Sequence, residues 1–169
     1  MTTRHGFAPS PLGELMYAAE GNALVAVYFP KHEKQPVGGF GAAVTLADDS
    51  VLSRAAQQLG EYFAGTRHEF DLELAPRGEE FQQRVWRLLL DIPYGETTSY
   101  GAIATELGDP GLAQAVGGAV GRNPLSIVIP CHRVVGSDGR LTGYAGGIER
   151  KIYLLDHEEP PERAAQKLF

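Results

Sequence analysis

The only cysteine of this 169-residue chain lies in the stretch IVIPCHRVV, residues 127–135. Cys131 ends an apolar, β-branched run, and His132 and Arg133 follow it directly. A base and fixed positive charge beside a thiol lower its pKa from about 8.5 and make the nucleophilic thiolate available. A single cysteine is more often a small buried hydrophobic side chain. The stretch alone therefore leaves a reactive and a structural interpretation open.

The composition is that of an ordinary globular protein, with 43% hydrophobic and 21% charged residues. The length suits one medium domain or two small ones. No apolar run approaches the roughly 18 residues of a membrane span, and the N-terminus leads into no signal-peptide core. One cysteine excludes an internal disulfide and a multi-cysteine zinc site. We therefore expect a cytoplasmic protein in a reducing compartment, with no membrane partner and no metal.

The charge is unevenly distributed along the chain. The net charge is −6, but residues 110–153 carry +3 and the remainder carries −9. The overall acidity argues against nucleic-acid binding over the whole surface, whereas a local basic face could meet a phosphate backbone. An ordinary solvated surface would show the same distribution, so the charge does not decide between the two.

The first 75 residues have the pattern of a small α/β unit. Loose alternation over residues 12–29, broken at residues 20–22, predicts a β-hairpin. Residues 31–43 are polar and glycine-rich and predict a loop. Asp48-Asp49-Ser50 predicts the start of a helix that Gly65 ends. Period-two alternation over residues 70–74 predicts one more strand, and residues 75–78 are the best domain boundary because Pro and Gly interrupt the pattern there.

From Glu79 onward the pattern becomes helical. Two short predicted helices, residues 100–107 and 112–122, are joined by the turn Gly108-Asp109-Pro110-Gly111, which is typical of a helix-turn-helix. The second of them is built almost entirely from small residues. Its three glycines cost about 1 kcal/mol each relative to alanine, so we expect another helix or a DNA groove to approach its backbone closely. A last helix is predicted over residues 148–157.

Five segments together identify a family resemblance. The chain resembles the O6-alkylguanine-DNA alkyltransferases, or methylated-DNA–protein-cysteine methyltransferases, closely over residues 80–158 and more loosely over the first 75. The segments that carry it, in the family's order and spacing, are residues 92–101, 115–119, 123–124, 129–134 and 143–147. The resemblance implies an α+β fold, with an N-terminal ribonuclease-H-like α/β domain over residues 1–76. It implies a mostly helical C-terminal domain with a helix-turn-helix over residues 77–169.

The resemblance also implies a function. Proteins of this family repair double-stranded DNA by flipping an O6-alkylguanine out through the minor groove. The alkyl group passes directly and irreversibly to a cysteine, which here is Cys131, so each molecule acts once. O4-alkylthymine is a second candidate substrate. No cofactor is needed, no obligate protein partner is evident, and a monomer is expected.

The resemblance assigns roles to individual residues. Glu158 orients His132, which accepts the thiol proton through a water, as in a Cys-His-acid triad. Tyr100 helps rotate the nucleotide and donates to the purine, and Asn123 braces the turn between the second short helix and the cysteine strand. The remaining DNA contacts are assigned to Gln114, Ala115, Gly117, Gly118, Arg122 and Arg133, together with Tyr100. The substrate pocket is assigned to Val134, Tyr144, Ala145 and Lys151.

Two positions depart from the family pattern. Gln114 stands where the family usually has an arginine that fills the gap left by the flipped base, and Ala145 stands where serine is common. Gln114 keeps one alternative open, an alkyltransferase-like damage-recognition protein with weak transfer on duplex DNA, although such proteins lack the cysteine. A Cys-His-Glu hydrolase is a third interpretation. It has no identifiable oxyanion-hole loop and leaves the helix-turn-helix unexplained.

Overall fold

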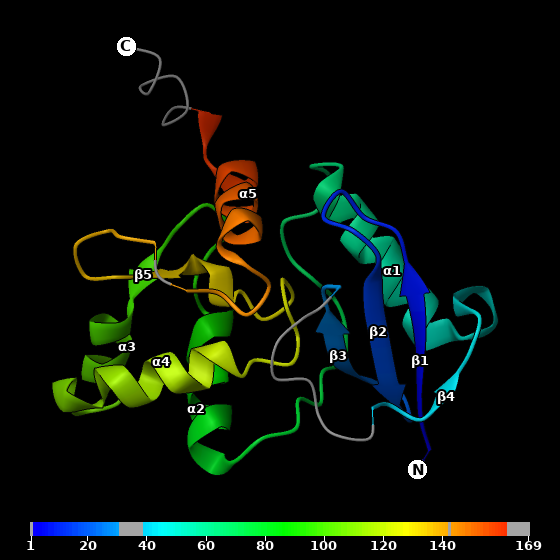
Figure 1. The fold of residues 1–169 in the computed structure, drawn as a ribbon, viewed down its shortest axis with the longest axis horizontal. Helices are drawn as coiled ribbons and strands as arrows, with labels where there is room; N and C mark the ends of the chain where they lie inside the picture. The colour runs from blue at the N-terminus through cyan, green and yellow to red at the C-terminus, as the bar shows by residue number, and fades with distance from the viewer. Residues whose placement is uncertain (1, 31–38, 142, 162–169) are drawn as a thin grey trace.

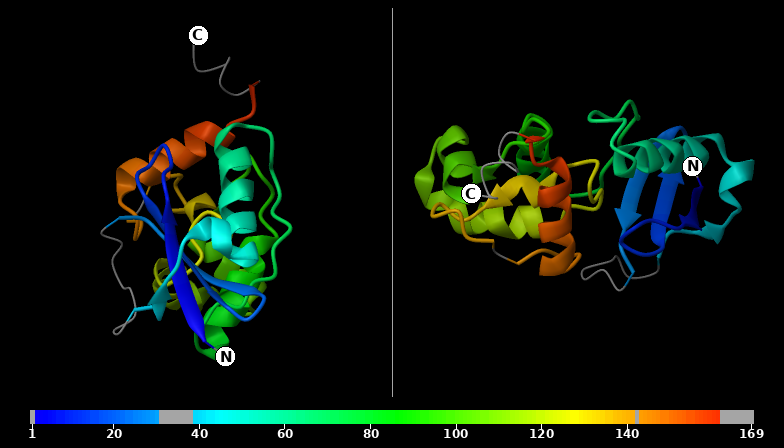
Figure 2. Two further views of the ribbon diagram at one scale, coloured as in Figure 1. Left: turned by 90° about the vertical axis from the view of Figure 1, so that its right-hand side faces the viewer. Right: turned by 90° about the horizontal axis from the view of Figure 1, so that it is seen from above.

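The computed structural model describes residues 2–30, 39–141 and 143–161. A β-sheet with one helix lies beside a group of helices along the long axis of the molecule (Figure 1, Figure 2). The first part contains β1 (Thr3–Ala8), β2 (Leu15–Glu20), β3 (Ala23–Tyr28), β4 (Ala42–Ala43), the 3-10 helix η1 (Leu46–Asp48) and α1 (Ser50–Phe63). The second contains α2 (Glu80–Leu90), β5 (Thr98–Ser99), α3 (Tyr100–Glu106), η2 (Pro110–Leu112), α4 (Ala113–Gly121), η3 (Cys131–Arg133), β6 (Val134–Val135) and α5 (Ile148–Glu158). This is the expected α+β class.

The sheet has the strand order β3-β2-β1-β4. The predicted hairpin is present as the antiparallel pair β2 and β3, and β1, which the sequence pattern did not reveal, extends the sheet. Helix α1 covers the sheet with the apolar face that its helical spacing predicts, and Asp49 caps it by accepting from the backbone N–H groups of Val51 and Leu52. The buried residues of that face include Leu52, Ala55, Leu59 and Tyr62.

The strand predicted over residues 70–74 is wrong. Within this segment the ladder is reduced to one isolated bridge, between Leu24 and Leu74. The Leu24 N–H donates to the Glu73 carbonyl at 2.8 Å, and the Ala75 N–H donates to the Leu24 carbonyl at 2.9 Å. Alternation of apolar and polar residues shows only that one side of an extended chain is buried. An extended segment that bonds a sheet edge at one point shows the same alternation without forming a strand.

The same edge strand, β3, also binds the second part of the molecule. The Val27 N–H donates to the Pro124 carbonyl at 2.9 Å, and the Ser126 N–H donates to the Val27 carbonyl at 3.2 Å. Buried apolar residues from both parts form one continuous core around this contact. The sheet therefore fixes the segment that follows α4.

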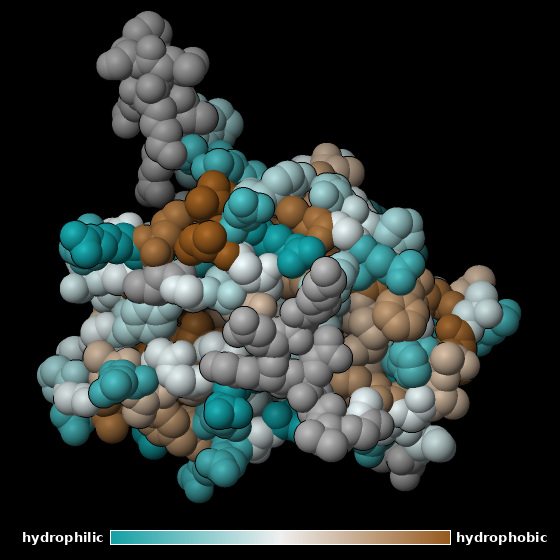
Figure 3. Space-filling view, in the orientation of Figure 1, coloured by the Kyte–Doolittle hydropathy of each residue, from teal (hydrophilic) through white to brown (hydrophobic). Residues whose placement is uncertain are grey.

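The helical part is organised around the predicted helix-turn-helix, formed by α3 and α4 with η2 between them. Trp86 of α2 is buried, and its indole N–H donates to the Ala119 carbonyl of α4 at 2.8 Å. Apolar surface is exposed over α5 (Figure 3), which carries Ile148 and Ile152 on its outer side. Within the described ranges, no helix combines the length and the apolar character needed to cross a membrane.

Removing the N-cap of α1 tests how much Asp49 contributes to the stability of the N-terminal part. Asp49 also pairs with the Arg4 guanidinium of β1. We expect Asp49→Ala to lower the free energy of unfolding by about 1 to 2 kcal/mol, because two backbone N–H groups lose their acceptor. Urea titration measures it. Asp48→Ala, at the exposed neighbouring carboxylate, is the matched control and should change stability little. Equal losses in the two variants would contradict the capping role.

Candidate functional site

The backbone that carries Cys131 is a series of tight turns. The predicted cysteine strand is wrong, because residues 127–130 have no strand partner and Cys131 begins the short helix η3. The Val128 N–H donates to the Ser126 carbonyl at 2.8 Å, and the Cys131 N–H donates to the Ile129 carbonyl at 2.7 Å. Ile127 has φ +72°, a left-handed conformation that costs about 1 kcal/mol or more and is held by its burial in the core.

Asn123 ties the two ends of this turn together. Its Oδ1 accepts from the Leu125 N–H at 2.9 Å, and its Nδ2 donates to the Ile129 carbonyl at 2.8 Å. The side chain is buried, so these bonds are shielded from water. Asn123 therefore fixes the position of the backbone immediately before Cys131.

A buried carboxylate, Glu158, accepts hydrogen bonds from three side chains, and Arg133 bonds both of its oxygens. Glu158 Oε1 accepts from Arg133 Nε at 2.7 Å, and Oε2 accepts from His132 Nε2 at 2.7 Å and from the Tyr62 hydroxyl at 2.6 Å. Burial by itself would raise the pKa of Glu158, but the hydrogen bonds and charges of His132 and Arg133 outweigh it and hold the pKa well below its usual range. Glu158 is therefore ionised and accepts on both oxygens.

The ionised carboxylate fixes the tautomer of His132. A carboxylate cannot donate, so Nε2 carries the ring proton and Nδ1 is left with a free lone pair. Nδ1 is buried and has no hydrogen-bond partner in the described part of the chain. Burial lowers the pKa of His132 in spite of Glu158, so the imidazole is neutral near pH 7. The side chain next to Cys131 is thus a base with its accepting nitrogen available.

The sequence predicts a thiol with a lowered pKa, but the structure gives Cys131 a raised pKa. Cys131 is buried, and burial raises the pKa of its thiol, while the side chains of Asn123 and Tyr144 and the charge of Lys151 oppose that rise. The expectation of a lowered pKa is wrong because burial disfavours the thiolate, and the guanidinium of Arg133 is engaged by Glu158 and does not offset that effect. The thiol therefore needs a base to remove its proton during reaction.

A small pocket opens beside the thiol. Its volume is about 30 Å³, which is room for about one water molecule, so a larger ligand requires its walls to move. The hydroxyls of Ser126 and Tyr144 in its wall are buried without a hydrogen bond of ordinary geometry in the described residues. Burial raises the pKa of Tyr144 well above the usual value, with Cys131 adding to the rise, so this hydroxyl stays protonated. The lining residues are Tyr100, Gly117, Val120, Gly121, Asn123, Ser126, Cys131, Gly143, Tyr144 and Ala145.

Several of the expected site residues meet at this pocket. Tyr100, Asn123, Tyr144 and Ala145 line it with Cys131. Val134 and Lys151 do not line it. Instead, the Lys151 ammonium donates to the Val134 carbonyl at 2.7 Å in the interior. Of the residues assigned to the DNA interface, Gly117 lines the pocket and the exposed ones are Gln114, Ala115, Gly118 and Arg122.

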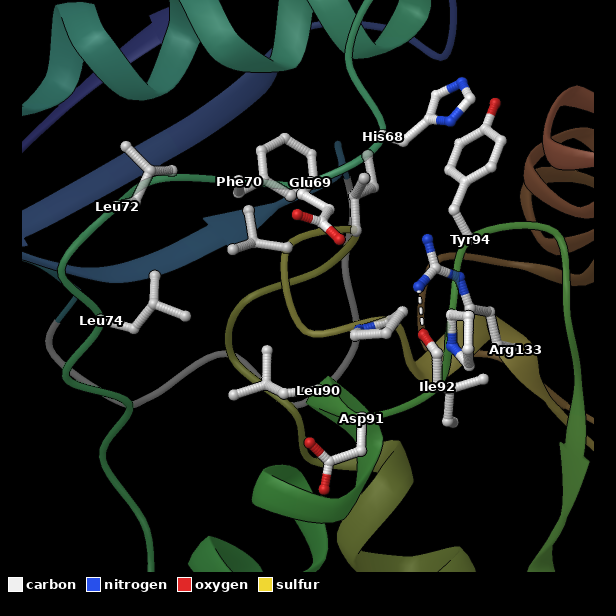
Figure 4. A pocket seen from close by; sticks show the side chains of 14 residues that line it. His68, Glu69, Phe70, Leu72, Leu74, Leu90, Asp91, Ile92, Tyr94 and Arg133 are labelled. Atoms are coloured by element: carbon white, nitrogen blue, oxygen red, sulfur yellow. Dashed lines mark hydrogen bonds between the residues drawn. The ribbon is translucent and has the colours of Figure 1, made fainter.

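Arg133 is the one assigned DNA contact that the structure contradicts. Its side chain is buried and bonds both Glu158 oxygens, and its Nη1 donates to the Ile92 carbonyl at 2.6 Å (Figure 4). A guanidinium whose donors are used in the interior cannot reach a phosphate. Its position in the sequence, directly after His132, gives no sign of this because the partner Glu158 lies in a distant helix.

A larger cavity of about 380 Å³ lies between the two parts (Figure 4). It is bordered by residues 68–74, residues 90–94 and the 127–133 turn, but Cys131 does not line it. The His68 ring stacks on Tyr94 with centroids 3.8 Å apart, and the Arg133 guanidinium lies over the Tyr94 ring. Arg133 thus lines this cavity and also bonds Glu158.

Sequence reasoning missed Tyr62 and Ser126. Tyr62 lies on the buried apolar face of α1, and its hydroxyl reaches Glu158. A polar-tipped side chain on the buried face of a helix was the available signal, because a buried tyrosine hydroxyl usually finds a partner. Ser126, in the turn before Cys131, carried no comparable signal.

Comparison with known proteins covers nearly the whole chain. Residues 80–160 match the family model for the 6-O-methylguanine DNA methyltransferase DNA-binding domain, and residues 3–76 match its ribonuclease-like domain. A methylated-DNA–protein-cysteine methyltransferase of Mycobacterium bovis is 48% identical over 160 residues, 95% of this chain and 94% of that protein. One of Methanosarcina acetivorans is 44% identical over 154 residues, 88% of this chain and 94% of that protein.

Solved structures agree with these matches. The crystal structure of a Mycobacterium tuberculosis O6-methylguanine methyltransferase has a TM-score of 0.82 at 43% identity, covering 97% of this chain and 99% of that one. Mycobacterium tuberculosis OGT in complex with DNA has a TM-score of 0.81 at 44% identity, covering 95% and 97%. In the described residues, no three His, Cys, Asp or Glu side chains are grouped as a metal ion would require.

The negative charge of Glu158 should contribute to the free energy of unfolding. Glu158→Gln leaves the Arg133 guanidinium buried without its counter-charge, so we expect a loss of about 3 kcal/mol in the free energy of unfolding at pH 7. The folded-state pKa of Glu158 is depressed, so its contribution is present above the ordinary carboxyl pKa and is lost as the pH falls. Denaturant titration of parent and variant should therefore give a difference that shrinks on acidification to about pH 3. Glu149→Gln, exposed on the same helix, is the control. A pH-independent difference would contradict an ionised Glu158.

Proposed function

This chain belongs to the 6-O-methylguanine DNA methyltransferase family, and we propose that it repairs DNA at Cys131, with the side chains that surround the small pocket in the roles given below. The function is direct, stoichiometric transfer of an alkyl group from DNA to the protein. The observation that carries the assignment of the acceptor is the cluster in which Glu158 bonds His132 Nε2 and leaves Nδ1 without a partner in the described residues, in the residue that directly follows the chain's one thiol.

The chemistry follows from the state of each group. His132 Nδ1 takes the thiol proton through a water, since burial keeps the imidazole neutral and the thiol protonated at rest. The sulfur attacks the alkyl carbon, the S–C bond forms and the C–O6 bond breaks, and the guanine leaves with the electron pair and takes up a proton. We assign the donor toward the purine to Tyr100, which lines the pocket. The thioether has no route back to a thiol, so each molecule acts once.

One face of helix α4 is suited to close contact with DNA. Gln114, Gly117 and Gly121 follow one another at helical spacing, and the two glycines line the pocket while Gln114 is exposed one turn earlier. A face without side chains admits close contact in a narrow minor groove. We therefore assign the groove contact to α4, with exposed Arg122 near a phosphate and Gln114 entering the gap left by the flipped O6-alkylguanine.

Several finer assignments belong to the same proposal. We divide the chain into domains at residues 76 and 77, and we expect it to act as a monomer in the cytoplasm, because a nucleophilic thiol needs a reducing compartment. O4-alkylthymine is a second candidate substrate, and no cofactor is required. The alkyltransferase-like alternative is not favoured, because relatives that match 95% of the chain are named methyltransferases and Cys131 is present.

Mass spectrometry tests the acceptor. After mixing with a duplex oligonucleotide that contains O6-methylguanine, the intact protein should gain one methyl group in place of the thiol proton, located on Cys131 by peptide mapping. Product should not exceed one equivalent of protein. Cys131→Ser should gain nothing. Catalytic turnover, or consumption of the methylated base with Cys131 unmodified, would overturn the proposal.

Gln114→Arg tests the DNA-facing end of α4. Arginine fills the gap with a longer, charged plane, and if glutamine leaves about 1 to 2 kcal/mol of flipping support missing, the variant should repair duplex DNA about ten- to thirtyfold faster. Its rate with free O6-benzylguanine, which needs no flipping, should be unchanged. Gln57→Arg adds the same charge on exposed α1 and should not accelerate either reaction. Equal duplex rates for parent and Gln114→Arg would show that this position carries no functional weight.

A further inference from the structure

One of the groups that bind the Glu158 carboxylate comes from the N-terminal part of the chain. Tyr62, in the last turn of α1, is fully buried, and its hydroxyl donates to Glu158 Oε2 at 2.6 Å. The same oxygen accepts from His132 Nε2 at 2.7 Å. The phenol and the imidazole therefore share one acceptor atom, although 70 residues separate them in the sequence.

We propose that Tyr62 is a positioning residue for alkyl transfer, whose hydroxyl holds the Glu158 carboxylate in the orientation and charge state that make His132 the base for Cys131. The inference rests on the proposed function of Cys131 and His132. It gives the ribonuclease-like domain a direct part in the chemistry, through a single hydrogen bond that reaches the group supporting the base.

The Tyr62 ring is fixed from several sides, as a positioning role requires. It packs at ring-centroid distances of 5.0 Å from His157 on α5 and 5.8 Å from Phe70 in the segment that leaves α1. Tyr94, which lies under the Arg133 guanidinium, is 6.2 Å away. The His157 ring also contacts the Tyr62 carbonyl through Nε2 at 2.7 Å. Side chains from both parts of the molecule thus hold the phenol against Glu158.

The hydroxyl should act on the basicity of His132. A donor to Oε2 spreads the negative charge of Glu158, so the carboxylate stabilises the imidazolium less than it would without that donor. Removing the hydroxyl strengthens the stabilisation of the protonated ring, and His132 then stays protonated to higher pH. The other charged or titratable side chains that face this cluster are Arg133, Lys151, Tyr94, Cys131, Tyr144 and His157, and the substitution leaves all of them in place.

The test is Tyr62→Phe, which removes one oxygen and keeps the ring. The second-order rate of alkylation by free O6-benzylguanine is measured against pH, so that DNA binding does not enter. We expect a rate about three- to tenfold lower at pH 7, the size that the net contribution of one ordinary hydrogen bond gives. The acid limb of the profile should move to higher pH, which a loss of packing alone would not cause.

Tyr17→Phe is the matched control. It also removes the hydroxyl of a buried tyrosine, but Tyr17 lies in strand β2, outside the Glu158 cluster. It should leave the profile unchanged. A Tyr62→Phe profile that coincides with those of the parent and Tyr17→Phe would overturn the inference. If the parent itself fails to transfer the benzyl group to Cys131, the proposed function fails instead, and the two failures are distinct.

A second variant decides the question if Tyr62→Phe does not fold. Replacing Tyr62 by 3-fluorotyrosine keeps the hydroxyl and nearly the same volume but makes the phenol a stronger donor. The acid limb should then move to lower pH, opposite to the shift in Tyr62→Phe. An unshifted limb in the folded 3-fluorotyrosine protein would overturn the inference independently.

Discussion

A single buried carboxylate, Glu158, organises the centre of this molecule. It draws donors from α1 and η3 to the end of α5, so three segments far apart in the sequence meet at its two oxygens. Such a cluster adds little net stability, because taking its charges out of water costs about as much as their attraction returns. Its effect is on geometry. Any arrangement that separates Arg133 from Glu158 leaves a charge unpaired in the interior, and this disfavours other conformations of the turn that carries Cys131.

The N-terminal part is more than a support beside the reactive half. Strand β3 bonds the segment that leads from α4 into the thiol turn, and Tyr62 bonds the acid behind the base. The position of the sulfur is thus set by Asn123 and its own turn from one side and by the sheet from the other. Cys131, His132 and Glu158, to which we assign the chemistry, lie in the C-terminal half of the sequence, but their geometry depends on contacts with the N-terminal half.

Local sequence patterns predicted the parts of the fold that depend on local rules. The helices of residues 50–63 and 80–90 follow from apolar spacing and caps, and the family resemblance supplied the α+β fold and the pairing of His132 with Glu158. What failed depends on contacts distant in sequence. The segment 70–74 alternates like a strand but meets β3 at one point.

The chemistry at the thiol was predicted incompletely for the same reason. Arg133 carries the charge of a DNA contact, but its guanidinium pairs with Glu158. The pKa of the Cys131 thiol is raised by burial, which the neighbouring residues in the sequence do not reveal. The role inferred for Tyr62 could not be predicted from its surroundings in α1 either, because its partner lies in another helix.

The bonds along β3 have a further consequence for how the halves depend on each other. An uncovered strand edge offers N–H and C=O groups to any passing chain and is a template for aggregation. Here residues 73–75 and 124–126 cover part of that edge. Residues 124–126 of the C-terminal half therefore protect part of the sheet from pairing with other chains, an effect separate from the chemistry that we assign to Cys131.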